Sequence, residues 1–245
     1  MSGIRLLSAS VSAVLDAELM DPALGGFSLY QLMEMAAFSV ACSISQVYDK
    51  KTHPRILVCV GPGNNGGDAL AAARHLSHFG YKPTVLYPKP TKKDIYDGLV
   101  KQCKNLEMSF IDTIASDDNT MKNTDLVLDG IFGFNFGGDV RPPFDHVIST
   151  LKQSPSIPIV SIDIPSGWDV EKGNVDSRGL EPEMLISLTA PKLCAKFFKG
   201  KHHYLGLRMV PPFIAEKYQL NLPEYPGIDQ CVRLGPIGDN SDGLL

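Results

Sequence analysis

The chain has 245 residues, of which 44% are hydrophobic and 20% are charged, and its formal net charge is −4 at pH 7. This composition is typical of a globular protein, and the length fits one α/β domain or two smaller ones. The acidic balance gives no general attraction to nucleic acid, so we expect no nucleic-acid partner. No apolar run is long enough to span a membrane, so we expect no membrane partner.

The N-terminal segment Met1–Ser12 carries one arginine and several serines, a weak likeness to a transit peptide. Asp16 and Glu18 follow closely, whereas transit peptides contain few acids. We therefore predict a helix over Ser8–Met20 that belongs to the fold. The five cysteines form no Cys-x-x-Cys pair, which indicates reduced and mostly buried thiols. A cytoplasmic location is expected, with a mitochondrial one as the alternative.

The next signal is an apolar strand, Arg55–Val60, followed by a glycine-rich loop, Gly61–Asp68, and an alanine-rich helix, Ala69–Phe79, which Gly80 is placed to end. Strand, loop and helix in this order bind nucleotides in open α/β sheets. The glycines let the backbone approach a ligand, and successive N–H groups can bind an anion. Asp68 is expected to cap the helix.

The second strand, Thr84–Tyr87, ends in Pro88-Lys89-Pro90 and lacks the acid that holds a ribose hydroxyl in dinucleotide-binding dehydrogenases. Pro62 also removes a backbone donor from the loop. An ordinary NAD-dehydrogenase site is therefore not favoured. The pair Asn64-Asn65 beside Gly66-Gly67 exceeds what one turn requires and indicates contact with a polar ligand or a cation.

Strands and helices continue to alternate along the chain. Helices are predicted over Asp94–Asn105 and around Val147, Ile148 and Leu151, and strands over Ser109–Ile111, Leu126–Asp129, Ile157–Ile162 and Met184–Thr189. This pattern predicts an α/β fold, a three-layer α/β/α Rossmann-like arrangement with a mostly parallel central sheet. We expect one domain over residues 1–234, and a flexible tail over Gly235–Leu245, which is rich in Gly, Asp and Ser.

Several polar residues follow predicted strand ends, where ligands sit in such sheets. Asp129 closes an apolar strand and is either a loop cap or a functional carboxylate. Asp163 lies between apolar residues, so partial desolvation is expected, and it is either catalytic or holds the Pro165–Trp168 turn. Lys192 could pair with Asp163 or a phosphate, or lie on the surface. His202-His203 lack zinc-site spacing and are expected to be solvated.

A second glycine-rich loop, Gly133-Phe134-Asn135-Phe136-Gly137-Gly138-Asp139, follows the fourth strand. Taken alone it predicts a mobile connection, and its two phenylalanines offer flat apolar surface that is suited to covering a ring.

The complete loop Gly61-Pro62-Gly63-Asn64-Asn65-Gly66-Gly67-Asp68-Ala69-Leu70 resembles the signature of the NAD(P)H-hydrate epimerase family, also called the YjeF N-terminal domain. Similar motifs follow in the family's order: the helix Phe27–Ala37, the loop Asp129–Phe134, the strand end Ser161–Trp168 and Ala190-Pro191-Lys192. The resemblance runs from about Leu7 to Leu234. Ala37 and Ala69 stand where the family often has glycine.

The resemblance implies an isomerase that interconverts the R and S epimers of hydrated NADH and NADPH, coupled to an ADP- or ATP-dependent dehydratase, and a homodimer. It implies a potassium ion held by Asn65, Asp129 and Ser166, and catalysis by Asp163 and Lys192. The implied substrate-binding residues are Asn64, Asn65, Gly66, Gly67, Asp68, Gly133, Phe134, Asn135, Phe136, Gly137, Gly138, Asp139 and Asp163.

Two other classes of protein remain as alternatives. The first is a non-catalytic nucleotide- or protein-binding module, because some proteins of this fold are RNA-decapping scaffolds or bind lipoprotein. A pure scaffold has no chemical need for the polar set described above. The second is a nucleotide-binding transferase, which would need a phosphate-binding lysine in the glycine loop, and that lysine is missing.

Overall fold

The computed structural model of the chain describes residues 3–115, 119–235 and 237. Within these residues the strands form one eight-stranded sheet in the order β3-β2-β1-β4-β5-β6-β7-β8. All neighbouring strands are parallel except the last pair, β7 and β8. The predicted α/β fold class with a mostly parallel sheet is confirmed.

The strands are β1 (Arg55–Val60), β2 (Lys82–Leu86), β3 (Ser109–Ile111), β4 (Leu126–Gly130), β5 (Ile159–Ile162), β6 (Met184–Leu188), β7 (His202–Gly206) and β8 (Val232–Leu234). The helices are α1 (Ala9–Met20), α2 (Leu29–Val47), α3 (Asn64–His78), α4 (Asp94–Asn105), α5 (Asn119–Lys122), α6 (Phe144–Lys152) and α7 (Pro212–Lys217), with short 3-10 turns at Val175–Ser177 and Leu193–Phe197.

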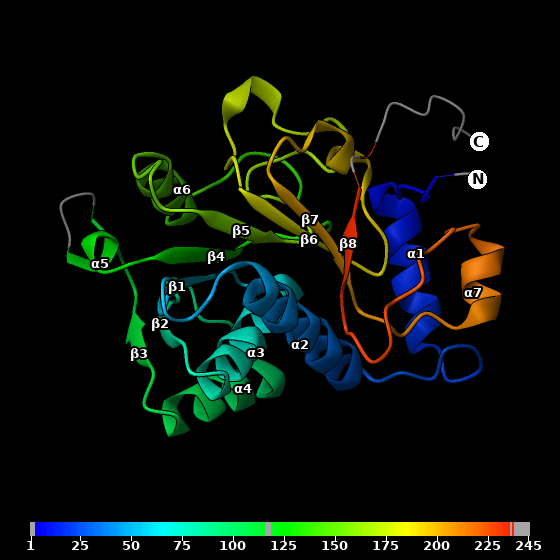
Figure 1. The fold of residues 1–245 in the computed structure, drawn as a ribbon, viewed down its shortest axis with the longest axis horizontal. Helices are drawn as coiled ribbons and strands as arrows, with labels where there is room; N and C mark the ends of the chain where they lie inside the picture. The colour runs from blue at the N-terminus through cyan, green and yellow to red at the C-terminus, as the bar shows by residue number, and fades with distance from the viewer. Residues whose placement is uncertain (1–2, 116–118, 236, 238–245) are drawn as a thin grey trace.

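The two faces of the sheet are covered unequally (Figure 1). Helices α2, α3 and α4 pack over one face and bury a large apolar cluster that runs from Met33 to Cys231. The other face carries the smaller cluster that contains α6 and Met121 of α5. Helices α1 and α7 share a third cluster beyond these layers.

Register brings the functional residues together at that edge. Asp129 at the end of β4 lies beside Cys59 of β1 and Ser161 of β5. Asp163 follows β5, and its backbone N–H donates to the carbonyl of Ile186 in β6 over 2.7 Å. Side chains that are far apart in the sequence therefore lie on adjacent strand ends, as the parallel pattern predicts.

The start of α3 differs from the sequence prediction. The helix begins at Asn64, Gly63 is its N-cap, and Asp68 lies buried in its second turn, so the prediction that Asp68 caps the helix is wrong. Most of the glycine-rich segment is helical because Gly66 lets the first turn press against the loop before it. A Cβ at Gly66 would lie 2.0 Å from the carbonyl oxygen of Gly61.

The solvated surface expected for His202-His203 is also wrong. Both residues lie in β7, a strand that the sequence analysis did not predict. The His203 side chain is 7% exposed and is hydrogen-bonded to Ser187 Oγ over 2.9 Å. Burial lowers the pKa of His203 to about 4, so it is neutral at physiological pH.

The remaining predictions concern the bounds of the elements, the cysteines, the C-terminal tail and membrane-spanning helices. Helix α4 and strands β1 and β3 have the predicted bounds, and Gly80, at φ +95°, follows the end of α3. All five cysteines are free, and four of them are buried. The predicted tail lies outside the described residues except for Gly235 and Ile237. No helix among the described residues is long and apolar enough to cross a membrane.

Candidate active site

Asp163 sits on a strained turn directly after β5. It has φ of +63°, and the N–H of Ile164 donates to the carbonyl of Ile162 over 2.7 Å, which closes a three-residue turn around Asp163. Thr189, after β6, has φ of +65° in an equivalent turn. Turns closed over a residue at positive φ are rare and strained, although aspartate tolerates this region better than most residues. Such strain concentrates at functional sites.

Asp163 forms a buried ion pair with Lys192. Lys192 Nζ donates to Asp163 Oδ1 over 2.5 Å and to the carbonyl of Leu188 over 2.9 Å. The two residues are 4% and 3% exposed, and the ammonium lies 5.3 Å from the ring centre of Phe134. No other hydrogen bond to the Asp163 carboxylate is found among the described residues. Its second oxygen therefore remains available to a ligand.

Backbone pairing holds Lys192 in place. Leu7 forms an isolated parallel bridge with Lys192: Leu7 N–H donates to the carbonyl of Pro191 over 2.9 Å, and Leu193 N–H donates to that of Leu7 over 3.0 Å. Helix α1 starts directly afterwards, and Ser8 caps it by accepting from Val11 N–H. The N-terminal segment is thus part of the site.

Asp16 of α1 is a site residue that sequence reasoning missed. Its neighbours Ser12, Leu15 and Leu19, one helical turn or less away, form the buried face of α1. Burial raises the pKa of Asp16 to about 6; Lys192 lowers it and Asp163 raises it. An aspartate among the apolar positions of Ser8–Met20 was the available signal, because acids rarely occupy a buried face without a role.

Asp68 belongs to the same cluster. Burial raises its pKa well above the usual value, the charges of Asp163 and Asp16 raise it further, and Lys192 lowers it. Asp16 and Asp68 thus both interact electrostatically with the Asp163–Lys192 pair, and both have raised pKa values.

Asp129 lies in a different environment. It is fully buried, and its carboxylate accepts four hydrogen bonds: from Ile131 N–H at 3.2 Å, Ser161 Oγ at 2.8 Å, Ser166 N–H at 2.9 Å and Ser166 Oγ at 2.5 Å. Burial raises the pKa of Asp129, and these hydrogen bonds lower it. No cationic side chain pairs with it among the described residues.

Asn65 lies beside this group, as the sequence analysis expected. Its Nδ2 donates to the carbonyls of Phe132, at 2.9 Å, and Ile162, at 3.3 Å, while Phe132 N–H donates to Ser166 Oγ over 3.1 Å. Asn65, Asp129 and Ser166 are thus joined through Phe132 and Ser166. One carboxylate among neutral amide, hydroxyl and carbonyl oxygens fits a monovalent cation, because hard cations take oxygen ligands and a divalent ion favours more carboxylates.

The N-terminus of α3 brings its backbone amides to the same edge. Asn64 is exposed there, and Tyr96 of α4 donates to its Oδ1 over 2.8 Å. Gly67 packs against α2, since a Cβ there would lie 2.5 Å from Met33 Cε. A helix N-terminus with free N–H groups attracts anions such as a pyrophosphate. The segment for which the sequence predicts anion binding therefore contains the N-terminus of a helix.

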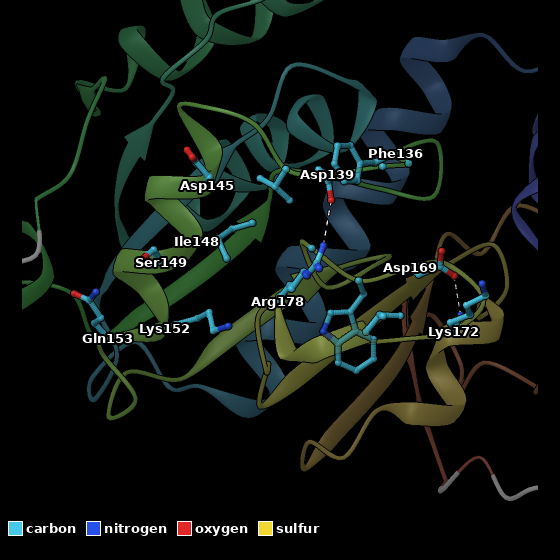
Figure 2. Close-up of a pocket in the computed structure, with 16 residues that line it drawn as sticks. Phe136, Asp139, Asp145, Ile148, Ser149, Lys152, Gln153, Asp169, Lys172 and Arg178 are labelled. Atoms are coloured by element: carbon cyan, nitrogen blue, oxygen red, sulfur yellow. Dashed lines mark hydrogen bonds and ion pairs between the residues drawn. The ribbon is translucent and has the colours of Figure 1, made fainter.

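The structure divides the second glycine-rich loop between two places. Phe134 faces Lys192, whereas Phe136, Gly137, Gly138 and Asp139 line a cavity of about 700 Å³ between the loop, α6 and residues 167–178. Figure 2 shows Asp139 and Arg178 facing each other in this cavity, where their side chains are 3.2 Å apart. Asp163 and Lys192 do not line it. Asn135 is exposed and does not line this cavity.

Comparison with known proteins agrees with this geometry. Residues 29–194 match the family model described as YjeF-related protein N-terminus. The crystal structure of yeast ynu0 (YNL200c) superposes with a TM-score of 0.87, at 36% sequence identity, over 94% of this chain and 100% of the yeast chain. An Arabidopsis thaliana protein named pyridoxine/pyridoxamine 5'-phosphate oxidase 1, chloroplastic, is 52% identical over 95% of this chain. The match spans 45% of that plant protein.

Proposed function

The chain belongs to the family of YjeF-related protein N-termini, and from this membership we propose that it is an NAD(P)H-hydrate epimerase. The substrate is hydrated NADH or NADPH, which carries a hydroxyl at C6 of the nicotinamide ring, next to the ring nitrogen. The observation that supports the proposal most strongly is the buried Asp163–Lys192 pair, which lies at the same sheet edge as the anion-attracting N-terminus of α3.

In the proposed reaction, the pair holds one transferable proton that Lys192 passes to Asp163. Asp163 gives this proton to the C6 hydroxyl, the C6–O bond breaks, and the ring-nitrogen lone pair forms a double bond to C6 as water leaves. Water then adds to the opposite face of C6, and the Asp163 carboxylate takes up the proton that it loses. Atoms and charge balance over the cycle, and only the configuration at C6 changes. General acid–base catalysis of this kind requires a side chain that lies within hydrogen-bond reach of the reacting group and can both give and accept a proton.

The remaining assignments belong to the same proposal. Asn65, Asp129 and Ser166 would hold a potassium ion, which would supply positive charge beside the substrate's phosphates. Asn64 to Asp68, with the Gly133–Asp139 loop, would hold the dinucleotide. The product would pass to an ADP- or ATP-dependent dehydratase specific for the S epimer, and the protein would act as a homodimer. A cytoplasmic location remains a prediction, since the Arabidopsis protein is chloroplastic by name.

The oxidase named for the Arabidopsis protein is not part of this proposal, because this chain matches only 45% of that protein. The alternative is a non-catalytic nucleotide- or protein-binding module. A binding module has no need for a buried ion pair on a strained turn, since burying two charges is costly and such a pair contributes little net stability.

The test is epimerase turnover. An R/S mixture of hydrated NADH is given to the protein with an excess of S-specific dehydratase in potassium buffer. We expect fast and complete conversion to NADH, and the Asp163→Asn variant should leave the R half to its spontaneous rate. If the unaltered protein also consumes only the S half, the epimerase proposal is wrong and the binding module becomes the better account.

A further inference from the structure

The segment after β2 carries an unusual concentration of positive charge. Lys89, Lys92 and Lys93 lie within five residues of a chain whose net charge is −4, and all three are exposed. None forms an ion pair with any residue that the structure describes. No acid occurs between the end of β2 and Asp94. The three ammonium groups are therefore free to bind an anion.

This lysine segment, residues 88–93, is fastened to the glycine-rich loop. Thr91 Oγ1 donates to the carbonyl of Pro62 over 2.7 Å, and Thr91 N–H donates to the hydroxyl of Tyr87 over 3.0 Å. Pro88 and Pro90 restrict the backbone on the N-terminal side of Thr91. The lysines thus lie on both sides of a point held against the loop that precedes the N-terminus of α3.

Strand order gives the direction in which a bound dinucleotide would lie. From the lysine segment towards Asp163 the strands run β2, β1, β4 and β5. Neighbouring strands are about 4.8 Å apart, so these two ends of the site are separated by roughly 14 Å. A ligand with its nicotinamide at Asp163 and its pyrophosphate at the N-terminus of α3, which follows β1, therefore carries its adenosine over the end of β2.

The chemistry at the end of β2 distinguishes the two dinucleotides. In Rossmann-like sites an acid there binds the ribose 2′-hydroxyl of NAD, and a cation accommodates the 2′-phosphate of NADP. We propose that Lys89, Lys92 and Lys93 form a 2′-phosphate subsite, so that hydrated NADPH is preferred over hydrated NADH. This inference rests on the proposed epimerase function and adds a specificity to it.

The experiment compares kcat/KM for the two hydrates in the unaltered protein and in the variant K89A/K92A/K93A. We expect the unaltered protein to favour hydrated NADPH by about tenfold or more, which corresponds to about 1.4 kcal/mol. In the variant this preference should fall at least about fivefold through a higher KM for hydrated NADPH, while kcat/KM for hydrated NADH stays within about twofold. Raising the salt concentration should reduce the preference of the unaltered protein, since exposed charges are screened.

The matched control is K51A/K82A/K122A, which removes the same charge. Lys51 precedes β1, Lys82 begins β2, and Lys122 ends α5 before β4, so these exposed lysines lie at the opposite edge of the sheet. Their removal should leave the preference unchanged. An effect of the control equal to that of K89A/K92A/K93A would overturn the subsite in favour of net charge alone.

Two further outcomes separate this inference from the function on which it rests. Equal kcat/KM for both hydrates in the unaltered protein overturns the subsite while leaving the epimerase in place. If neither hydrate is epimerised, the proposed function is wrong, and calorimetric titration with NADP⁺ and NAD⁺ decides the subsite by itself. Tighter binding of NADP⁺ that K89A/K92A/K93A abolishes supports it, and equal binding overturns it.

Discussion

Asp129 lies at the end of β4, and Asp163 follows the adjacent parallel strand β5. Both residues are buried, yet their surroundings are opposite. Asp129 accepts four hydrogen bonds from neutral donors on three short stretches of chain. Among the residues that the structure describes, the Asp163 carboxylate has one partner, the ammonium of Lys192, and one of its oxygens has no protein hydrogen bond. A carboxylate that accepts four hydrogen bonds is fixed in its position and its charge state. A carboxylate with one hydrogen-bond partner can bind a ligand and exchange a proton. Two similar residues on one edge thus suit different tasks.

The substitution Asp163→Asn has the largest expected effect and tests the difference between the two aspartates most directly. Asparagine keeps the shape, tolerates the left-handed turn and still accepts from Lys192, but it cannot carry the proton. We expect kcat to fall by about 10³-fold or more, within the range for loss of a general acid–base group, with dinucleotide binding retained. Turnover, calorimetric binding and thermal unfolding check this. Near-normal turnover would remove Asp163 from the mechanism.

Asp129→Asn should act mainly on stability. The new NH2 group places a donor where a carboxylate oxygen accepted hydrogen bonds, so at least one buried N–H or O–H loses its acceptor. We expect a loss of about 3 kcal/mol in the free energy of unfolding, measured in urea. The response of turnover to potassium should also disappear. Asp145→Asn, on the exposed surface of α6, is the control, and a Asp129→Asn variant as stable as this control would contradict the structural role.

Asp16→Asn tests the cluster around Asp163 through pH. Burial raises the folded-state pKa of Asp16 to about 6, well above the ordinary value of an aspartate, and the charged groups that interact with it are Lys192, Asp163 and Asp68. A raised pKa means that the proton stabilises the fold. This contribution is fully present below about pH 4 and is lost as pH rises through about 6.

The variant and the unaltered protein should therefore be similarly stable at pH 4, and the variant more stable by about 1–3 kcal/mol at pH 8. Urea unfolding at both pH values measures the difference. A stability difference that is the same at both values would show that Asp16 does not titrate between them.

Ser161→Ala should have the smallest effect. It removes one of four donors to Asp129 and leaves Asp163 untouched. We expect about 1 kcal/mol less stability and an unchanged kcat, measured by urea unfolding and turnover. A large fall in kcat would show that the two carboxylates act as one unit and would remove the distinction drawn between them.

Much of the fold could be predicted from the sequence because the strands are short apolar runs and the helices have a clear apolar periodicity. Helix α4 has an apolar stripe that alone fixes its bounds. Strands β7 and β8 were missed because β7 begins with two histidines, and a neutral, hydrogen-bonded histidine inside a sheet has no local signature. The early start of α3 was missed because asparagine and glycine are poor helix formers, and tertiary packing overrides that preference.

The candidate site was predictable to a similar extent. Strand ends that meet at one edge predicted that the glycine-rich loop, Asp129, Asp163 and Ser166 lie close together, and the family resemblance implied the grouping of Asn65, Asp129 and Ser166. The pairing of Lys192 with Asp163 was one of three alternatives that the sequence left open. Asp16 was not predicted, because nothing near it in the sequence shows that α1 docks beside Lys192. The contact joins two segments that are far apart in the chain. The periodicity of apolar residues does not reveal which distant segments pack together.

The bridge between Leu7 and Lys192 also bears on when the protein becomes active during folding. It joins two residues that are far apart in the chain, and contacts of such long separation form late because loop closure must come first. The central sheet can assemble before the N-terminal segment arrives. Refolding should therefore show burial of the sheet first and the gain of turnover afterwards, with the arrival of the first dozen residues as the completing event.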